Sequence, residues 1–171
     1  MSLVTRPGRI GLVLAAALIA VDQATKAWAI RLPELVSHDV VWPLRWTRIW
    51  NEGVSFGLLQ ASHDLARWAL FAFSVIVGAL LANWARTQER LFPAVALGLI
   101  VAGAWGNAID RAIHGAVIDF VDVSQLGFFP YIFNVADAAI TIGVILLIWD
   151  SFKPQTPPPT ASRPPPPDGE D

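Results

Sequence analysis

The chain has 171 residues, a length that suits one domain, and 54% of its residues are hydrophobic while only 15% are charged. This composition is too apolar for an ordinary soluble domain, and the near-neutral net charge of −2 argues against a nucleic-acid partner. The chain lacks cysteine, which excludes disulfides and thiol catalysis. Its three histidines, His38, His63 and His114, lie far apart without an H-E-x-x-H motif, so we predict no metal ion or other cofactor.

Four apolar segments follow one another along the chain and predict four transmembrane helices, since a bilayer core takes roughly 20 helical residues. The first has basic residues before it, as a signal peptide does, but its apolar character resumes after Lys26, so we interpret it as a permanent helix. We therefore predict an all-α membrane protein with a helical domain over residues 1–153. The four segments are 10–30, 68–85, 91–109 and 138–149, and the last is long enough only if its helix extends over 135–152.

Residues 35–59, between the first two apolar segments, have a different pattern. The stretch from Leu44 to Trp50 alternates apolar and polar side chains, as strands do, although its tryptophans recur every four residues, as in a helix. Pro43 and the β-branched residues favour strands. We predict a small β-sheet at the membrane surface, where tryptophan prefers to lie. Other tryptophans near helix ends fit the same interfacial belt: Trp28, Trp68, Trp84 and Trp149.

The basic residues give a weak indication of orientation, because lysine and arginine divide equally between the two predicted sides of the membrane. Arg6 and Arg9 before the first helix, and Arg86 and Arg90 in the short second loop, favour termini in the cytoplasm. Residues 154–171 are rich in proline and have no apolar pattern, so we predict a disordered cytoplasmic tail.

Ionisable residues inside apolar segments are costly, so each is a candidate for function. Asp22 precedes Lys26 by four residues, which favours an ion pair on one helix face, either structural or shaping an active site. After the predicted strands, Asn51 is followed by Gly53 and Gly57, which indicate either a close backbone approach or a plain turn.

The third apolar segment ends in a group of small and polar residues. Gly103 and Gly106 form a face that suits close helix packing. Asn107, Asp110 and Arg111 share a helix face, and a structural Asp110–Arg111 pair is one interpretation.

Two further aspartates, Asp119 and Asp137, come before and at the start of the fourth segment. Asn134 has the position of an N-cap and Asp137 that of the third helical residue, so Asp137 can be a capping residue. It can equally be half of a carboxylate dyad, in which two carboxylates share a proton and one acts as a base on water. Spacing alone does not decide whether Asp119 meets Asp137, and Asp22 and Asp110 are rival partners.

Three other functional classes stay open from the residues alone. A proton-coupled transporter would use the membrane carboxylates, although no internal repeat is visible. A non-enzymatic assembly protein would use the same polar groups to join helices. A serine–lysine protease would combine Ser55 with Lys26.

Four blocks of residues together resemble the lipoprotein signal peptidase family, over roughly residues 21–150. Any one block is a weak signal, but all four in this order on a chain of this kind are specific. Glu52, Val54 and Ser55 depart from the residues usual in the family, which affects loop details only. The blocks are Asp22-Gln23-Ala24-Thr25-Lys26, Asn51-x-Gly53-x-x-Phe56, Gly106-Asn107-Ala108-Ile109-Asp110-Arg111 with Val117-Ile118-Asp119-Phe120, and Phe133-Asn134-Val135-Ala136-Asp137.

The resemblance implies a membrane aspartic endopeptidase with four transmembrane helices and a small periplasmic sheet. It implies removal of signal peptides from diacylglyceryl-modified prolipoproteins, with cleavage before the lipidated cysteine, at the periplasmic surface of a bacterial inner membrane. The expected partners are these precursors and the lipid bilayer, and we expect a monomer. By motif position the catalytic pair is Asp119 and Asp137. The supporting or substrate-binding residues are Asp22, Lys26, Asn51, Gly53, Asn107, Asp110, Arg111 and Asn134.

Overall fold

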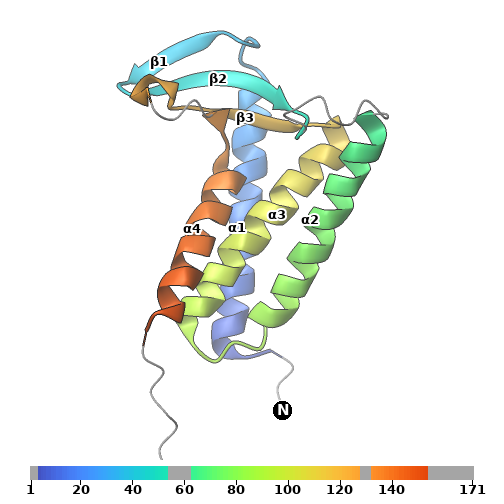
Figure 1. Cartoon of the computed structure of the whole chain (residues 1–171), viewed down its shortest axis with the longest axis vertical. Coiled ribbons are helices and arrows are strands. Elements are labelled where there is room, and N and C mark those ends of the chain that lie inside the picture. Colours follow the sequence, from blue (N-terminus) through green and yellow to red (C-terminus); the bar gives the residue numbers. More distant parts are fainter. Residues whose placement is uncertain (1–3, 54–62, 128–131, 154–171) are drawn as a thin grey trace, which may run out of the picture.

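The structure is a computed structural model, and it describes residues 4–53, 63–127 and 132–153. Four helices form a bundle, and a small sheet lies across one end of it (Figure 1). All four predicted helices are present, and the third continues five residues beyond its predicted end. The predicted disordered tail, residues 154–171, lies outside the described residues. The helices are α1 (Arg6–Ala29), α2 (His63–Ala85), α3 (Leu91–His114) and α4 (Val135–Ser151).

Helix α3 is the centre of the bundle and packs against α1, α2 and α4. Its glycines allow backbones to touch: a Cβ at Gly98 would lie 2.3 Å from the carbonyl oxygen of Gly11 in α1. A Cβ at Gly103 would lie 2.2 Å from the carbonyl oxygen of Ala136 in α4. The close packing predicted for this face of α3 is therefore confirmed, and it sets where α4 begins.

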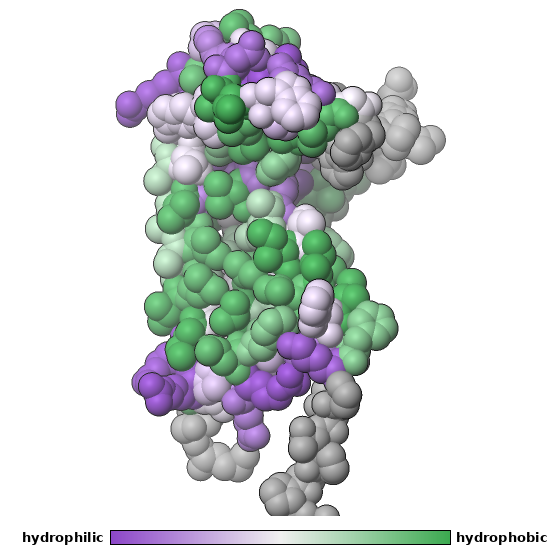
Figure 2. Space-filling model, turned by 90° about the vertical axis from the view of Figure 1, so that its left-hand side faces the viewer, coloured by the Kyte–Doolittle hydropathy of each residue, from purple (hydrophilic) through white to green (hydrophobic). Residues whose placement is uncertain are grey.

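The outside of the bundle is apolar between two polar ends (Figure 2). On α2, for example, Phe73 and Leu80 are each 65% exposed, a pattern that suits contact with lipid better than contact with water. Among the described helices, α1, α2 and α3 are long and apolar enough to cross a membrane. Helix α4 has 17 residues, a rise of about 26 Å. Length and composition therefore support three of the four predicted spans.

The sheet is antiparallel with strand order β1-β2-β3-β4. Strands β1 (Ser37–Val41) and β2 (Leu44–Asn51) confirm the strands predicted between the first two helices, within residues 35–53 of that segment, which the structure describes. Strands β3 (Val117–Asp122) and β4 (Ile132–Phe133) come from the segment between α3 and α4, with a short 3₁₀ helix, η1 (Ser124–Leu126), after β3. Pairing of β2 with β3 sets Ile49 opposite Asp119 and so brings the end of β2 beside that aspartate.

An apolar layer joins the sheet to the bundle. Trp28, near the end of α1, makes edge-on contacts with Trp46 of β2 and Phe120 of β3, with ring centroids 5.4 and 6.0 Å apart. Ala29 and Ile118 are buried in the same cluster. Burial of these side chains favours one position of the sheet over the helix ends, and β3 thereby comes close to the start of α4.

Candidate active site

Asp119 and Asp137 line one cavity of about 710 Å³. Asp119 lies in β3 and Asp137 is the third residue of α4, so the cavity lies where the sheet meets the start of α4. Asn51, at the end of β2, also contributes to its wall. The other lining residues are mainly apolar and come from β4 and the first turns of α4: Ile132, Phe133, Ala138, Thr141 and Ile142.

Asparagine side chains hold both carboxylates. Asp119 accepts hydrogen bonds from Nδ2 of Asn134 at 2.6 Å and from Nδ2 of Asn51 at 2.9 Å. Asp137 accepts one from Nδ2 of Asn107 at 2.8 Å. Asn134 also donates to Oδ1 of Asn107 at 3.3 Å. The two carboxylates are therefore tied to one another through two side chains, although their residues are 18 positions apart in the sequence.

Asn134 also has the N-cap role that the sequence predicted. Its Oδ1 accepts a hydrogen bond from the backbone N–H of Asp137 at 2.9 Å, and Asp137 accepts one from the backbone N–H of Asn134 at 3.3 Å. This reciprocal pair is a capping box. Asp137 can therefore cap the helix and also belong to the site, because its Oδ2 bonds to the backbone of Asn134 while its Oδ1 bonds to Asn107.

Asp119 is only 1% exposed, and this burial raises the pKa of its carboxyl to about 6. The negative charge of Asp137 raises it as well, while hydrogen bonds from Asn51 and Asn134 and the charge of Lys26 lower it. Asp119 can therefore hold a proton at a pH where an ordinary aspartate has lost it.

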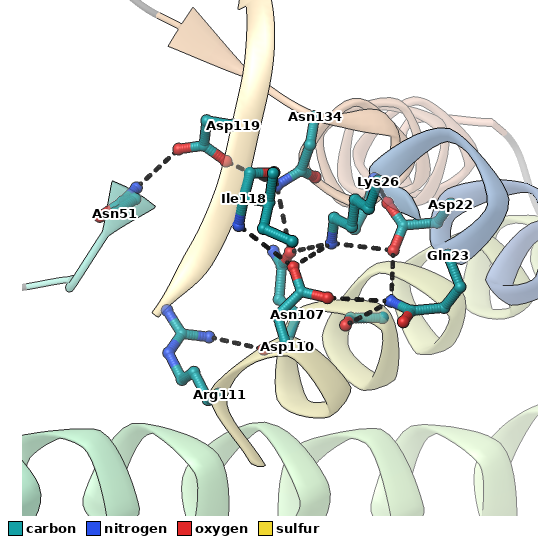
Figure 3. A network of polar contacts seen from close by, with 12 residues as sticks. Asp22, Gln23, Lys26, Asn51, Asn107, Asp110, Arg111, Ile118, Asp119 and Asn134 are labelled. Carbon is teal, nitrogen blue, oxygen red and sulfur yellow. Dashed lines mark hydrogen bonds and ion pairs between the residues drawn. The ribbon is translucent and has the colours of Figure 1, made fainter. Parts of the chain in front are cut away.

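Lys26 is almost fully buried and lies in the network of polar contacts that also includes Asn134 and Asp119 (Figure 3). Its ammonium group is 2.8 Å from Asp22, as predicted from their spacing, and also 2.8 Å from Asp110. Its third hydrogen bond goes to Oδ1 of Asn107 at 3.0 Å. The ion-pair partner of Asp110 is thus Lys26 and not Arg111. Asp22 and Asp110 do not line the cavity, and they connect to Asp119 and Asp137 through Lys26, Asn107 and the backbone.

Gly53 and Arg111 lie at the edge of the site. Gly53 has a φ of +77°, and its N–H donates to Oδ1 of Asn51 at 2.8 Å. The positive φ and this contact fit the predicted turn, and a Cβ at Gly53 would also lie 2.6 Å from Cδ1 of Leu70, so both predicted reasons for a glycine here agree with the structure. Arg111 donates to the carbonyl oxygen of Asn107 at 3.4 Å, and its Nε has no hydrogen-bond partner among the described residues. Gly57 lies outside the described residues.

Sequence reasoning missed the part played by Gln23 and by two backbone N–H groups. Gln23 donates to Asp110, and the N–H groups of Ile118 and Ala136 donate to Asp110 and Asp22. The position of Gln23, three residues before Lys26 on the same helix face, is the signal that could have found it.

Apolar helices with two carboxylates, Asp119 and Asp137, on one cavity at the end of the bundle are the features of a membrane-bound enzyme. The sequence profile of signal peptidase (SPase) II matches residues 14–153. The lipoprotein signal peptidase of Caulobacter vibrioides is 44% identical over 153 residues, covering 87% of this chain and 90% of that protein. That of Methylorubrum extorquens is 47% identical over 150 residues, covering 85% and 87%.

Solved structures agree with these sequence matches. A bacterial membrane enzyme determined by the in meso method at 1.9 Å resolution aligns with a TM-score of 0.75 and 33% identity, covering 85% of this chain and 94% of its own. A second, at 2.3 Å resolution, aligns with a TM-score of 0.72 and 32% identity, covering 83% and 87%. The chain belongs to the signal peptidase II family of proteases and is a bacterial membrane protein.

Proposed function

We propose that the protein is an aspartic endopeptidase that removes signal peptides from diacylglyceryl-modified prolipoproteins by cutting before the lipidated cysteine. The observation that carries the proposal is the placing of Asp119 and Asp137 on one cavity, each held by asparagines that also contact one another. The substrate class comes from the relatives, which are named lipoprotein signal peptidases.

The two carboxylates have different surroundings, which suggests different roles. Burial raises the pKa of Asp119, so this residue holds the shared proton and donates it toward the scissile carbonyl oxygen. Asp137 lies at the start of α4, where the helix dipole stabilises its negative charge, and it takes a proton from the attacking water. The water oxygen bonds to the carbonyl carbon to form a tetrahedral intermediate. The C–N bond then breaks, Asp137 gives the proton it took from water to the leaving nitrogen, which becomes the new amino terminus, and Asp119 takes back a proton from a hydroxyl of the intermediate as the new carboxyl group forms.

We also propose four membrane spans, with both termini in the cytoplasm and the cavity at the periplasmic surface. Helix α1 begins and α4 ends at the end of the bundle away from the sheet (Figure 1). Arg6, Arg9 and Arg86 belong to that same end and lie next to helix termini, which favours the cytoplasmic face for it by the positive-inside rule. In this orientation the lipid of the substrate stays in the bilayer while its peptide enters the cavity beside α4.

The contacts of Lys26 argue against a serine–lysine mechanism. All three N–H groups of its ammonium are used, by Asp22, Asp110 and Asn107, and the side chain is buried away from the cavity wall. A lysine that acts as a general base must be neutral and must reach its nucleophile. Ser55 itself lies outside the described residues.

The proposed activity is tested with the purified protein in detergent, using a prolipoprotein with and without its diacylglyceryl group. We expect cleavage of the lipid-modified form, and mass spectrometry should find a product that begins at the modified cysteine. Failure of the folded protein to cleave that substrate would contradict the proposal. Cleavage at another bond would show that the protein is a protease but that the assigned cleavage site is wrong.

A further inference from the structure

Gln23 of α1 joins two buried carboxylates, those of Asp22 and Asp110 (Figure 3). Its Nε2 lies 3.0 Å from Oδ1 of Asp110 and 3.2 Å from Oδ2 of Asp22, and also 3.2 Å from the carbonyl oxygen of Gly106. None of its described hydrogen bonds reaches Asp119 or Asp137, so any effect of Gln23 on the dyad must pass through Asp22 and Asp110.

Each of these carboxylates holds the backbone next to one member of the dyad. Oδ1 of Asp22 accepts a hydrogen bond at 2.9 Å from the N–H of Ala136, the residue before Asp137. Oδ2 of Asp110 accepts one at 3.2 Å from the N–H of Ile118, the residue before Asp119. The separation of the two carboxylates therefore limits the separation of the two backbone segments that carry the dyad.

The charges of this cluster explain why a neutral donor is needed. Asp22 and Asp110 are each 1% exposed and share one cation, Lys26, at 2.8 Å. One positive charge cannot fully compensate two buried negative charges that repel one another. Further hydrogen-bond donors are therefore needed to stabilise the two carboxylates. Gln23 supplies a donor to both, so each carboxylate receives one hydrogen bond from Gln23, one from Lys26 and one from the backbone.

We propose that Gln23 is a positioning residue of the active site, which fixes the distance between the backbone before Asp119 and the backbone before Asp137 by bridging Asp22 and Asp110. This inference rests on the dyad of the proposed function. A small displacement of one carboxylate relative to the other slows the chemical step, because both must meet the same water and carbonyl group. Binding of the substrate, which depends on the cavity walls, changes little.

The kinetic test compares Gln23→Leu with Gln125→Leu. The first removes the bridge and keeps the size of the side chain, while the second makes the same chemical change at an exposed site on η1, where Gln125 bonds to Asp39. We expect Gln23→Leu to lower kcat roughly 10- to 100-fold with KM within about twofold, and Gln125→Leu to change neither. A folded Gln23→Leu protein with wild-type kcat would overturn the inference, even if its Tm were lower.

A second measurement does not depend on cleavage. Labelling valine carbonyl carbons together with isoleucine and alanine nitrogens limits the amide signals to the six isoleucines and alanines that follow a valine, and Ile118 and Ala136 are two of these. We expect both signals to move in Gln23→Leu and to stay in Gln125→Leu. Unmoved signals in the folded variant would overturn the positioning role. If the wild type does not cleave prolipoprotein, only the proposed function is contradicted. The amide signals would still show whether Gln23 positions the backbone at Ile118 and Ala136.

Discussion

Asp119 and Asp122 lie three residues apart on β3, and their pKa values shift in opposite directions. Burial raises the pKa of Asp119 to about 6. Burial alone would also raise the pKa of Asp122, but hydrogen bonds from Ser124 and Thr47 and the charge of Arg45 outweigh it and lower the value. Asp122 is thus a charged structural group of the sheet, while Asp119 is the carboxyl of this strand that can hold a proton for chemistry.

The raised pKa of Asp119 predicts how activity depends on pH. Its proton is present below about 6 and is lost as the pH rises through that value, so kcat/KM should fall on the alkaline side. The groups that influence this carboxyl from the neighbouring helices are Asp137 and Lys26. Asn51→Ala removes a hydrogen bond that lowers the pKa, so the alkaline fall should move to higher pH.

A pH–rate profile of the wild type and of Asn51→Ala checks this prediction. Because the dyad titrates as a unit, the profile reports apparent values of the pair. A wild-type rate that does not depend on carboxylate ionisation would contradict the shared-proton mechanism. An alkaline fall that moves to lower pH in Asn51→Ala would contradict the assignment of the proton to Asp119.

Removal of Lys26 should destabilise the protein strongly. Lys26→Met leaves Asp22 and Asp110 buried without a cation, which typically costs about 3–5 kcal/mol of unfolding free energy. Adding Asp22→Asn removes one of the two facing charges, so the double variant should be more stable than Lys26→Met alone. Unfolding in bicelles measures both, and equal stability of Lys26→Met and wild type would refute the ion-pair account.

At the residue scale, the sequence predicted polar contacts within one helix but not polar contacts between elements. The Asp22–Lys26 pair and the Asn134 cap follow from helix spacing, and both are present. No spacing rule connects Lys26 to Asn107 or Asn134 to Asp119, because those contacts depend on how the helices and β3 pack. That Asp119 and Asp137 line one cavity was likewise not fixed by spacing, and the catalytic role proposed for the pair comes from the family resemblance.

At the scale of elements, we expect the contact between α3 and α4 to set the position of Asp137. Gly103→Ala would place a methyl group 2.2 Å from the carbonyl oxygen of Ala136, and a backbone so close to the capping box cannot yield without moving Asp137. We expect this variant to lose both stability and activity. Gly98→Ala creates a similar clash with Gly11, but toward the other end of α3, so it should lose stability while its folded fraction stays active.

Thermal unfolding and activity per folded molecule separate these two outcomes. Equal activity of folded Gly103→Ala and folded Gly98→Ala would show that the α3–α4 contact does not set the site. A loss of activity in folded Gly98→Ala alone would place the sensitive contact between α1 and α3.

The elements themselves were predicted unevenly. The helices were predicted because long apolar runs carry their own signal, and β1 and β2 because of Pro43 and the pattern around Trp46. Strand β3 was not predicted. Nearly all of its residues are buried, so it lacks the alternation of apolar and polar side chains that marks a half-exposed strand.

At the scale of the whole molecule, the proposed orientation separates two exposed positions. Thr87 lies in the turn between α2 and α3, and Asp39 lies on β1 at the opposite end of the bundle (Figure 1). The chain has no cysteine, so Thr87→Cys and Asp39→Cys each introduce a single thiol. In intact spheroplasts, a membrane-impermeant maleimide should label Asp39→Cys only. Labelling of Thr87→Cys alone would invert the proposed topology.

The most direct test of the dyad is cleavage of a diacylglyceryl-modified prolipoprotein by the wild type and by three isosteric variants. We expect Asp119→Asn and Asp137→Asn to fold and to lose activity by several orders of magnitude, because neither can share a proton between two carboxylates. Asp110→Asn alters the support of Ile118 and the contacts with Lys26 and Gln23 but leaves both members of the dyad in place, so this variant should be weakened but active. Substantial cleavage by folded Asp119→Asn or Asp137→Asn would contradict the central claim that these two residues carry out the hydrolysis.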